Sequence, residues 1–263
     1  MKATSKIIKY ELHDVFRSKW LIIYTLFFLV TTDLLFRFST SGAIVILNLM
    51  NIVLLFIPLI SIVFGTMYLY HSREFIELLL SQPINRSSLF KGMYSGLAFP
   101  LSTGFAAGVA IPFLFHGVQN PAQQNMFLVL LVCGIFLTFI FVALAFLIAV
   151  RHEDSVKGLG ISIFTWLLFT VIYDGLLLLF SFIFKAYPIE KTLIVLTLFN
   201  PVDLARILLL LKFDISALMG YTGAVFQKFF GGSMGIGISL FSLVVWVIAP
   251  LWIGLKIFIK KDF

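Results

Sequence analysis

Six apolar runs, each about as long as a membrane is thick, constrain the fold of this chain more than any other feature. A helix needs about 20 apolar residues to cross a hydrocarbon layer of ~30 Å. Such runs cover residues 20–38, 43–70, 93–115, 125–150, 158–184 and 234–259. Only 12% of the residues are charged, against about a quarter in an average globular protein. The sequence therefore predicts an all-α integral membrane protein with six transmembrane helices in one domain, 1–263, rather than a soluble fold.

Basic residues gather on one side of this predicted topology. With six spans, both termini share a side with the loops after the second and fourth spans. Most of the nineteen Lys and Arg residues fall on that side. They are Lys2, Lys6, Lys9, Arg17, Lys19, Arg73, Arg86, Lys91, Arg151, Lys157, Lys256, Lys260 and Lys261. The positive-inside rule places these segments in the cytoplasm. Nucleic-acid binding is not indicated, because the charges are spread over four segments beside a bilayer.

A polar stretch, residues 71–92, separates the second and third runs and carries an ordered set of charges and helix breakers. Residues 73–80, with the sequence Arg-Glu-Phe-Ile-Glu-Leu-Leu-Leu, have the spacing of a short amphipathic helix. Pro83 must end or kink that helix, and Arg86 and Lys91 lead into the next run. A lateral helix on the membrane surface is the simplest interpretation. Ordinary solvated charge is the alternative.

The N-terminal segment, residues 5–19, also has helical spacing. Ile8, Leu12, Val15 and Phe16 fall on one face, and basic side chains fall on another. This pattern is typical of an interfacial helix that lies in the plane of the membrane surface. We therefore expect an N-terminal interfacial helix before the first span.

The segment 186–232 lies between the fifth and sixth spans and includes a run, 193–211, that is nearly long enough to cross. Asn200, Pro201, Asp203 and Arg206 interrupt this run. Spanning would bury a charged pair and a helix breaker, and would move the basic C-terminus outside. We therefore expect an outer segment that is either re-entrant or on the surface. Asn200 can cap a helix that starts at Pro201, with Asp203 complementing the dipole.

Two acidic residues, Asp33 and Asp174, interrupt the apolar spans. Charges at such positions are costly and are functional candidates by default. Asp33 precedes Arg37 by four residues, so the two side chains share a helical face and can pair. Asp174 has no basic residue within one turn, and we expect it to face the protein interior or an aqueous cavity.

The sequence lacks the patterns that carry catalysis. It has no Gly-x-x-x-x-Gly-Lys-Ser/Thr phosphate loop, so this chain is not itself an ATPase. The four histidines are far apart and the single cysteine, Cys133, lies inside an apolar run. No serine or cysteine stands in a glycine-framed nucleophile turn. We expect no catalytic residue, no metal site and no cofactor in this chain.

The 71–92 stretch carries a more specific pattern, in which acidic residues precede Leu-Leu-Leu-Ser-x-Pro-x-x-Arg. This pattern resembles the coupling segment of ABC-2-type transporter permeases, on which separate ATPase subunits dock. The resemblance assigns docking to Arg73, Glu74, Glu77, Ser81, Pro83, Arg86 and Lys91, and a second contact to Arg151, Glu153, Asp154 and Lys157. It also implies a non-catalytic subunit, with ATP and Mg bound by the partner ATPase.

Within this family, the six-span plan and the Asn-Pro-x-Asp-x-x-Arg run at 200–206 are most similar to the NosY type. That type belongs to the machinery that matures the copper centres of nitrous oxide reductase. The resemblance implies a homodimer of this chain with two ATPase subunits in the bacterial inner membrane, both termini being cytoplasmic. It also implies a periplasmic copper-handling protein on the outer segment, in contact with Asn200, Pro201, Asp203 and Arg206.

Three other functions fit parts of the same sequence. A generic ABC-2 exporter of a lipid, peptide or drug-like substrate would use the same docking segments. An ion-coupled secondary carrier would use Asp174, although a proton relay usually needs more such groups than the spans contain. A membrane anchor that only scaffolds a periplasmic assembly would tolerate wholesale substitution of the cytoplasmic loops.

Overall fold

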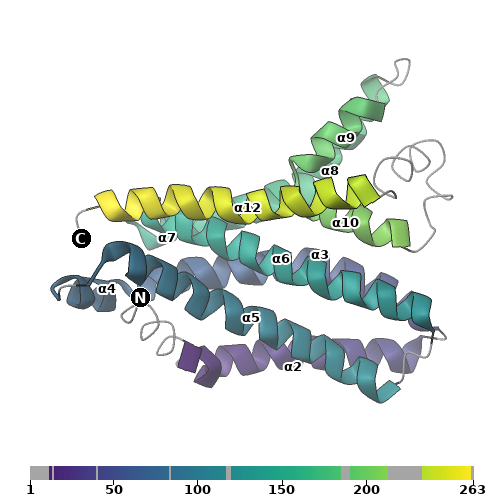
Figure 1. The fold of residues 1–263 in the computed structure, drawn as a ribbon, viewed down its shortest axis with the longest axis horizontal. Coiled ribbons are helices and arrows are strands. Elements are labelled where there is room, and N and C mark those ends of the chain that lie inside the picture. Colours follow the sequence, from purple (N-terminus) through teal and green to yellow (C-terminus); the bar gives the residue numbers. More distant parts are fainter. Residues whose placement is uncertain are drawn as a thin grey trace.

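A computed structural model describes residues 12–13, 15–39, 41–82, 84–116, 120–184, 190–212 and 233–261. Every regular element in these residues is a helix (Figure 1). The helices are α2 (Lys19–Phe38), α3 (Gly42–His71), α4 (Arg73–Leu80), α5 (Arg86–His116), α6 (Pro121–Arg151), α7 (Ser155–Leu167), η1 (Leu168–Ile172), α8 (Tyr173–Ile183), α9 (Glu190–Leu198), α10 (Pro201–Lys212) and α12 (Ser233–Lys260). The all-α prediction is confirmed.

Six of these segments are long and apolar enough to cross a membrane. They are α2, α3, α5, α6, the continuous helix α7-η1-α8, and α12. The six predicted spans are therefore confirmed, although several helices extend beyond the apolar runs. The largest extension is at α5, which begins at Arg86 because the Asn85 side chain accepts a 3.0 Å hydrogen bond from the Ser87 amide at its first turn.

The long helices lie side by side, with α6 in the centre of the bundle (Figure 1). Helices α3 and α12 pack along α6, and α2 packs mainly against α5. Helix α6 is apolar on every face, which is typical of a helix surrounded by protein. Phe105 and Phe146 are fully buried where α5 and α6 meet, with Phe105 against Gly134 and Phe146 against Phe90.

Two glycines of α5 let α2 approach closely. Gly104 and Gly108 are four residues apart and therefore share one helical face, as in the small-residue interfaces of membrane helices. A Cβ added at Gly108 would lie 2.7 Å from the Thr25 backbone oxygen and 2.9 Å from the Phe28 Cβ. The α2–α5 contact is thus made with backbone as well as side chains.

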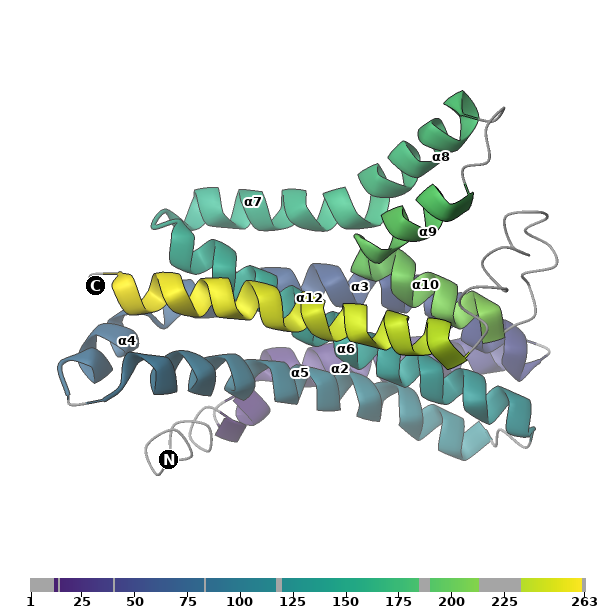
Figure 2. The same cartoon turned by 45° about the horizontal axis from the view of Figure 1, so that its top comes forward.

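The two ends of the bundle differ in charge and are called here the basic end and the far end. Helix α4, the start of α2 and the end of α12 lie at the basic end (Figures 1 and 2). The α2–α3 and α5–α6 connections lie at the far end. This arrangement agrees with the grouping of basic segments that the six-span topology predicts. That the basic end faces the cytoplasm stays a prediction.

The fifth span is not a uniform helix. Residues Leu168–Ile172 form one turn of π-helix, in which each hydrogen-bonded turn holds one residue more than in an α-helix. Beyond this turn α8 diverges from the bundle (Figure 2), and none of its residues is buried. The π-turn therefore marks the point where the fifth span leaves the core.

Helices α9 and α10 form a bent pair between the fifth and sixth spans. The axes of Thr192–Leu198 and Pro201–Leu211 differ by 114°. Both arms open toward the far end, and their junction lies beside the π-turn inside the bundle (Figure 2). The sharp bend agrees with the re-entrant arrangement, one of the two that the sequence left open, and the position of this pair relative to the membrane stays a prediction. Residues 186–189 and 213–232 of the predicted outer segment lie outside the described residues.

The predicted N-terminal interfacial helix falls mostly on residues that the structure does not describe. Leu12, His13 and residues 15–17 are helical. Val15 is buried and Phe16 is about half exposed. Ser18 precedes α2, which begins at Lys19. Residues 5–11 and 14 of the 5–19 prediction, including Ile8, lie outside the described residues.

Candidate functional site

The predicted coupling helix forms at the basic end as α4, with the bounds that its amphipathic spacing indicated. Ile76 is buried on its inner face, and Leu78 is 59% exposed on its outer face. Glu74, Glu77 and Ser81 are exposed, as is Lys91 on α5. The Arg73 guanidinium lies 5.8 Å from the centre of the Tyr70 ring. Pro83 lies outside the described residues.

The predicted second contact, the turn between α6 and α7, lies against the first. Asp154 caps α7, because its Oδ1 accepts hydrogen bonds from the amides of Val156 (2.9 Å) and Lys157 (3.4 Å). The Tyr70 hydroxyl at the end of α3 donates a 2.8 Å hydrogen bond to the His152 carbonyl. Gly158 makes this approach possible, since a Cβ there would collide with the same hydroxyl. Two loops distant in sequence are thus joined.

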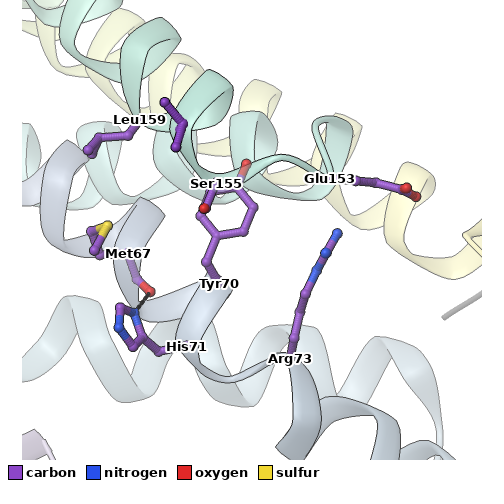
Figure 3. Close-up of a pocket in the computed structure, with 8 residues that line it drawn as sticks. Met67, Tyr70, His71, Arg73, Glu153, Ser155 and Leu159 are labelled. Carbon is purple, nitrogen blue, oxygen red and sulfur yellow. Dashed lines mark hydrogen bonds between the residues drawn. The ribbon is translucent and has the colours of Figure 1, made fainter.

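A cavity of about 420 Å³ lies between these two loops (Figure 3). Its lining combines apolar side chains with a polar set at its edge. The lining residues are Met67, Tyr70, His71, Arg73, Glu153, Ser155, Val156 and Leu159. Val156 is 78% exposed. An exposed apolar side chain on a charged surface is typical of a protein interface.

Arg86, predicted as a docking residue, points inward at the end of α12. Its Nη1 donates to the backbone carbonyls of Ile259 (3.2 Å) and Lys261 (2.5 Å). The Lys261 Nζ in turn donates to the Val150 carbonyl at 3.0 Å and lies 3.5 Å from the Glu153 Oε1. Sequence reasoning counted Lys261 only as a basic residue near a membrane. Nothing in the sequence signals its place beside α6.

A second polar cluster surrounds the junction of α9 and α10. As predicted, Asn200 caps α10, accepting a 3.0 Å hydrogen bond from the Val202 amide. Its Nδ2 donates to the Phe169 carbonyl in the π-turn at 2.8 Å and to the Asp203 Oδ2 at 2.9 Å. Asn200 is fully buried and Asp203 is 5% exposed. Partner contact through these residues stays a prediction, although in this conformation both side chains lie inside the protein.

Asp174 meets a basic partner that lies 32 residues away in the sequence. The Arg206 Nη1 donates to the Asp174 Oδ2 at 2.5 Å and to the Asp203 Oδ1 at 3.0 Å. Pairing of this kind is how charged groups are accommodated at membrane depth. The prediction of an inward-facing Asp174 agrees with this position. The sequence did not connect it with Arg206, which was expected in an outer segment.

The backbone at the same junction is also satisfied. The Tyr173 hydroxyl donates to the Leu196 carbonyl at 2.6 Å. The Leu198 carbonyl accepts from the Trp246 Nε1 (3.1 Å) and the Ser242 Oγ (3.2 Å). Carbonyls at the end of an interrupted helix have no intrahelical partner, and irregular backbone at membrane depth persists only where protein satisfies it. Hydrogen bonds from neighbouring helices therefore hold the junction in place within the bundle.

The predicted Asp33–Arg37 pair is confirmed at the far end. The Arg37 Nε donates to the Asp33 Oδ2 at 2.7 Å. The His116 Nε2 lies 3.6 Å from the other carboxylate oxygen, and its ring stacks on Phe36 at 4.8 Å. The Arg37 side chain is 68% exposed. Partial neutralisation of the Asp33 charge near the membrane surface is therefore enough to account for this pair, without a functional role.

The described residues contain no group of three or more His, Cys, Asp or Glu side chains that could hold a metal ion. Cys133 is buried in α6. The absence of a cofactor from this chain stays a prediction. The structure has two notable polar regions. One is the cavity between two joined loops at the basic end. The other is the hydrogen-bonded junction of α9 and α10 inside the bundle.

Comparison with known proteins agrees with this architecture. The model of the family described as "ABC-2 family transporter protein" matches residues 32–263. The "Probable ABC transporter permease protein NosY" of Stutzerimonas stutzeri is 24% identical, over 98% of this chain and 96% of that protein. The protein of the same name from Pseudomonas aeruginosa is also 24% identical, over 94% of this chain and 92% of its own length. Since the family match covers all six spans except most of the first, this chain belongs to the ABC-2 family of transporter membrane proteins.

Proposed function

We propose that this permease is driven by cytoplasmic ABC ATPase subunits that dock on its basic end. Two docking segments, residues 71–92 and 151–157, form the proposed surface. The observation that carries the proposal is the cavity of about 420 Å³ between them, with Val156 and Arg73 at its edge. ATP and Mg then bind to the partner subunit, and this chain contributes no catalytic group.

The position of α4 suits a mechanical role. It follows α3 directly at Ser72, and the chain enters α5 only a few residues after it. A displacement of α4 therefore acts on two membrane spans at once. The exposed charges of Glu74, Glu77 and Lys91 give the surface a pattern that an ATPase can match. The same segments are on the cytoplasmic side by the positive-inside rule.

The finer assignment that we propose is a role in assembling the copper centres of nitrous oxide reductase. It is supported by the NosY names of the two relatives and by the full-length extent of both matches. In this proposal two copies of the chain bind two ATPase subunits in the bacterial inner membrane, and both termini are cytoplasmic. A periplasmic copper-handling protein binds the outer segment, residues 186–232.

The first experiment is purification of the chain from its native membrane in mild detergent, followed by mass spectrometry of the bound subunits. An ATPase together with a periplasmic copper protein is the expected result. An ATPase without the copper protein would leave a generic exporter of a lipid, peptide or drug-like compound. Absence of any ATPase would overturn the proposal.

A matched pair of variants tests the docking surface itself. Val156→Ser removes an exposed apolar side chain beside the cavity, and we expect about tenfold weaker binding of the ATPase, the size of a modest interface hot spot. Leu178→Ser makes the same kind of change on α8, where Leu178 is 73% exposed at the far end. Equal ATPase binding by the two variants would count against a docking site at the cavity.

The ion-coupled carrier loses its main support in this geometry. Asp174 is neutralised by Arg206, so it is not an isolated carboxylate awaiting an ion. A carrier predicts transport that depends on pH or sodium without any ATPase, and that is abolished by Asp174→Asn. Under the proposed function, transport requires the ATPase and ATP.

A further inference from the structure

The end of α12 lies between the two docking segments, at the basic end of the bundle (Figure 2). We propose that it ties these segments into one rigid unit, with Lys261 and Arg86 as positioning residues. This inference rests on the proposed docking of an ATPase. It adds an element, the C-terminus of the last span, that neither docking segment contains.

The first tie joins α12 to the start of α5. Arg86 Nη1 donates to the carbonyl of Ile259 in the last turn of α12 and to that of Lys261, the residue directly after the helix. Carbonyls at the end of a helix lack intrahelical donors. A guanidinium at a helix C-terminus also interacts favourably with the helix dipole. Arg86 belongs to the first docking segment, so that segment is fixed to the last span.

The second tie joins the end of α12 to the last turn of α6, directly before the other docking segment. The Lys261 ammonium caps the Val150 carbonyl in the last turn of α6 and faces the Glu153 carboxylate. The Lys261 side chain is 14% exposed, whereas the Glu153 side chain is 76% exposed. An ion pair with so exposed a partner contributes little, so the bond to the Val150 carbonyl carries the tie.

Apolar packing beneath the two ties joins the same helices. Phe258 of α12 is fully buried, and its ring centre lies 5.2 Å from that of Phe90 on α5. Ile76 of α4 and Val150 of α6 line one small void with Phe258. Buried Ile76 thus places α4 beside the ends of α6 and α12, and packed interiors pass displacements to their neighbours.

Two exposed sites allow the rigidity to be measured on the full-length permease alone. Spin labels on cysteines at positions 78 and 156 report the distance between the docking segments, in a Cys133→Ala background. The wild type is expected to give one narrow distance distribution. Lys261→Met keeps the aliphatic stem but removes the donor, and the distribution should broaden. Lys260→Met changes the charge equally at the exposed neighbouring position and should leave it narrow.

Function is measured without labels, with the ATPase that co-purifies with the chain in nanodiscs. Lys261→Met should bind that ATPase as the wild type does, but lose about tenfold of the permease-dependent ATPase stimulation, the effect of one charge-assisted hydrogen bond. Lys261→Arg restores a donor and should recover it. If Lys261 only stabilised the fold, Lys261→Met would lower the yield of folded protein. The folded fraction would then bind and stimulate the ATPase as the wild type does.

The outcomes separate the two proposals. A broadened distribution with undiminished stimulation overturns the positioning role, as does a distribution that stays narrow in Lys261→Met. Failure of the wild-type chain to bind any ATPase overturns the proposed function instead, and the distance measurement still decides whether α12 ties the segments.

Discussion

The basic end and the α9–α10 junction both join segments that are distant in sequence, but they do so in different surroundings. At the basic end, the bonding groups include exposed side chains such as Glu153. At the junction, Asn200 is fully buried and Asp203 nearly so. Exposed pairs contribute little because water screens them, whereas a buried charge that loses its partner is strongly destabilising. Loss of an exposed pair such as that of Glu153 should therefore cost less than loss of a charge at the junction.

The largest expected effect is at the junction. Arg206→Ala removes the counter-charge of both Asp174 and Asp203, and we expect a loss of about 3 kcal/mol in the free energy of unfolding. The single cysteine provides the measurement. Cys133 is buried, so its labelling by a thiol-reactive dye during heating reports unfolding of the core.

Arg37→Ala is the matched control for this experiment, since it breaks an arginine–carboxylate pair whose arginine is 68% exposed. Its cost should stay below about 1 kcal/mol. Equal losses in the two variants would remove the distinction between the buried and the exposed cluster.

An intermediate effect is expected where the two docking segments touch. Gly158→Ala forces the Tyr70 hydroxyl away from the His152 carbonyl and should cost about 1–3 kcal/mol, the usual range for overpacking. Gly160→Ala, two residues later on α7, is the control, because no described atom lies within 4 Å of a Cβ added there. Thermal unfolding of both variants checks the difference, and an equally destabilised Gly160→Ala would contradict it.

The smallest effect is expected at the α7 cap. Asp154→Ala leaves the amides of Val156 and Lys157 without their side-chain acceptor and should cost about 1 kcal/mol locally. Hydrogen exchange at these two amides is the measurement, and it should accelerate while the α9–α10 junction remains protected. Faster exchange at the junction as well would mean that the two regions are not independent.

Much of the fold is predictable from local sequence because a membrane leaves few choices. Apolar runs of sufficient length give the six spans, and the spacing of residues 73–80 gives α4. Asn200 before Pro201 gives a helix start, and Asp33 four residues before Arg37 gives an ion pair. Each of these signals lies within one or two turns of helix, where geometry is fixed by the backbone.

Contacts between distant helices were not predictable in the same way. Nothing in the sequence links Asp174 to Arg206, or Lys261 to Val150, because helix packing rather than local spacing decides which ends meet. The π-turn at residues 168–172 likewise leaves no mark in composition, since an apolar run suits either helical winding. As a result, Arg206 was expected in an outer segment although it lies beside the fifth span.

The π-turn also sets the rotational phase of everything that follows it in the fifth span. One residue of an α-helix corresponds to about 100° of rotation. Deleting a single residue from 168–172 to restore regular winding would turn the face that bears Asp174 by about that angle. The carboxylate would then leave Arg206 and face another side of the bundle. The number of residues in the π-turn, as much as the charges themselves, thus keeps Asp174 next to Arg206.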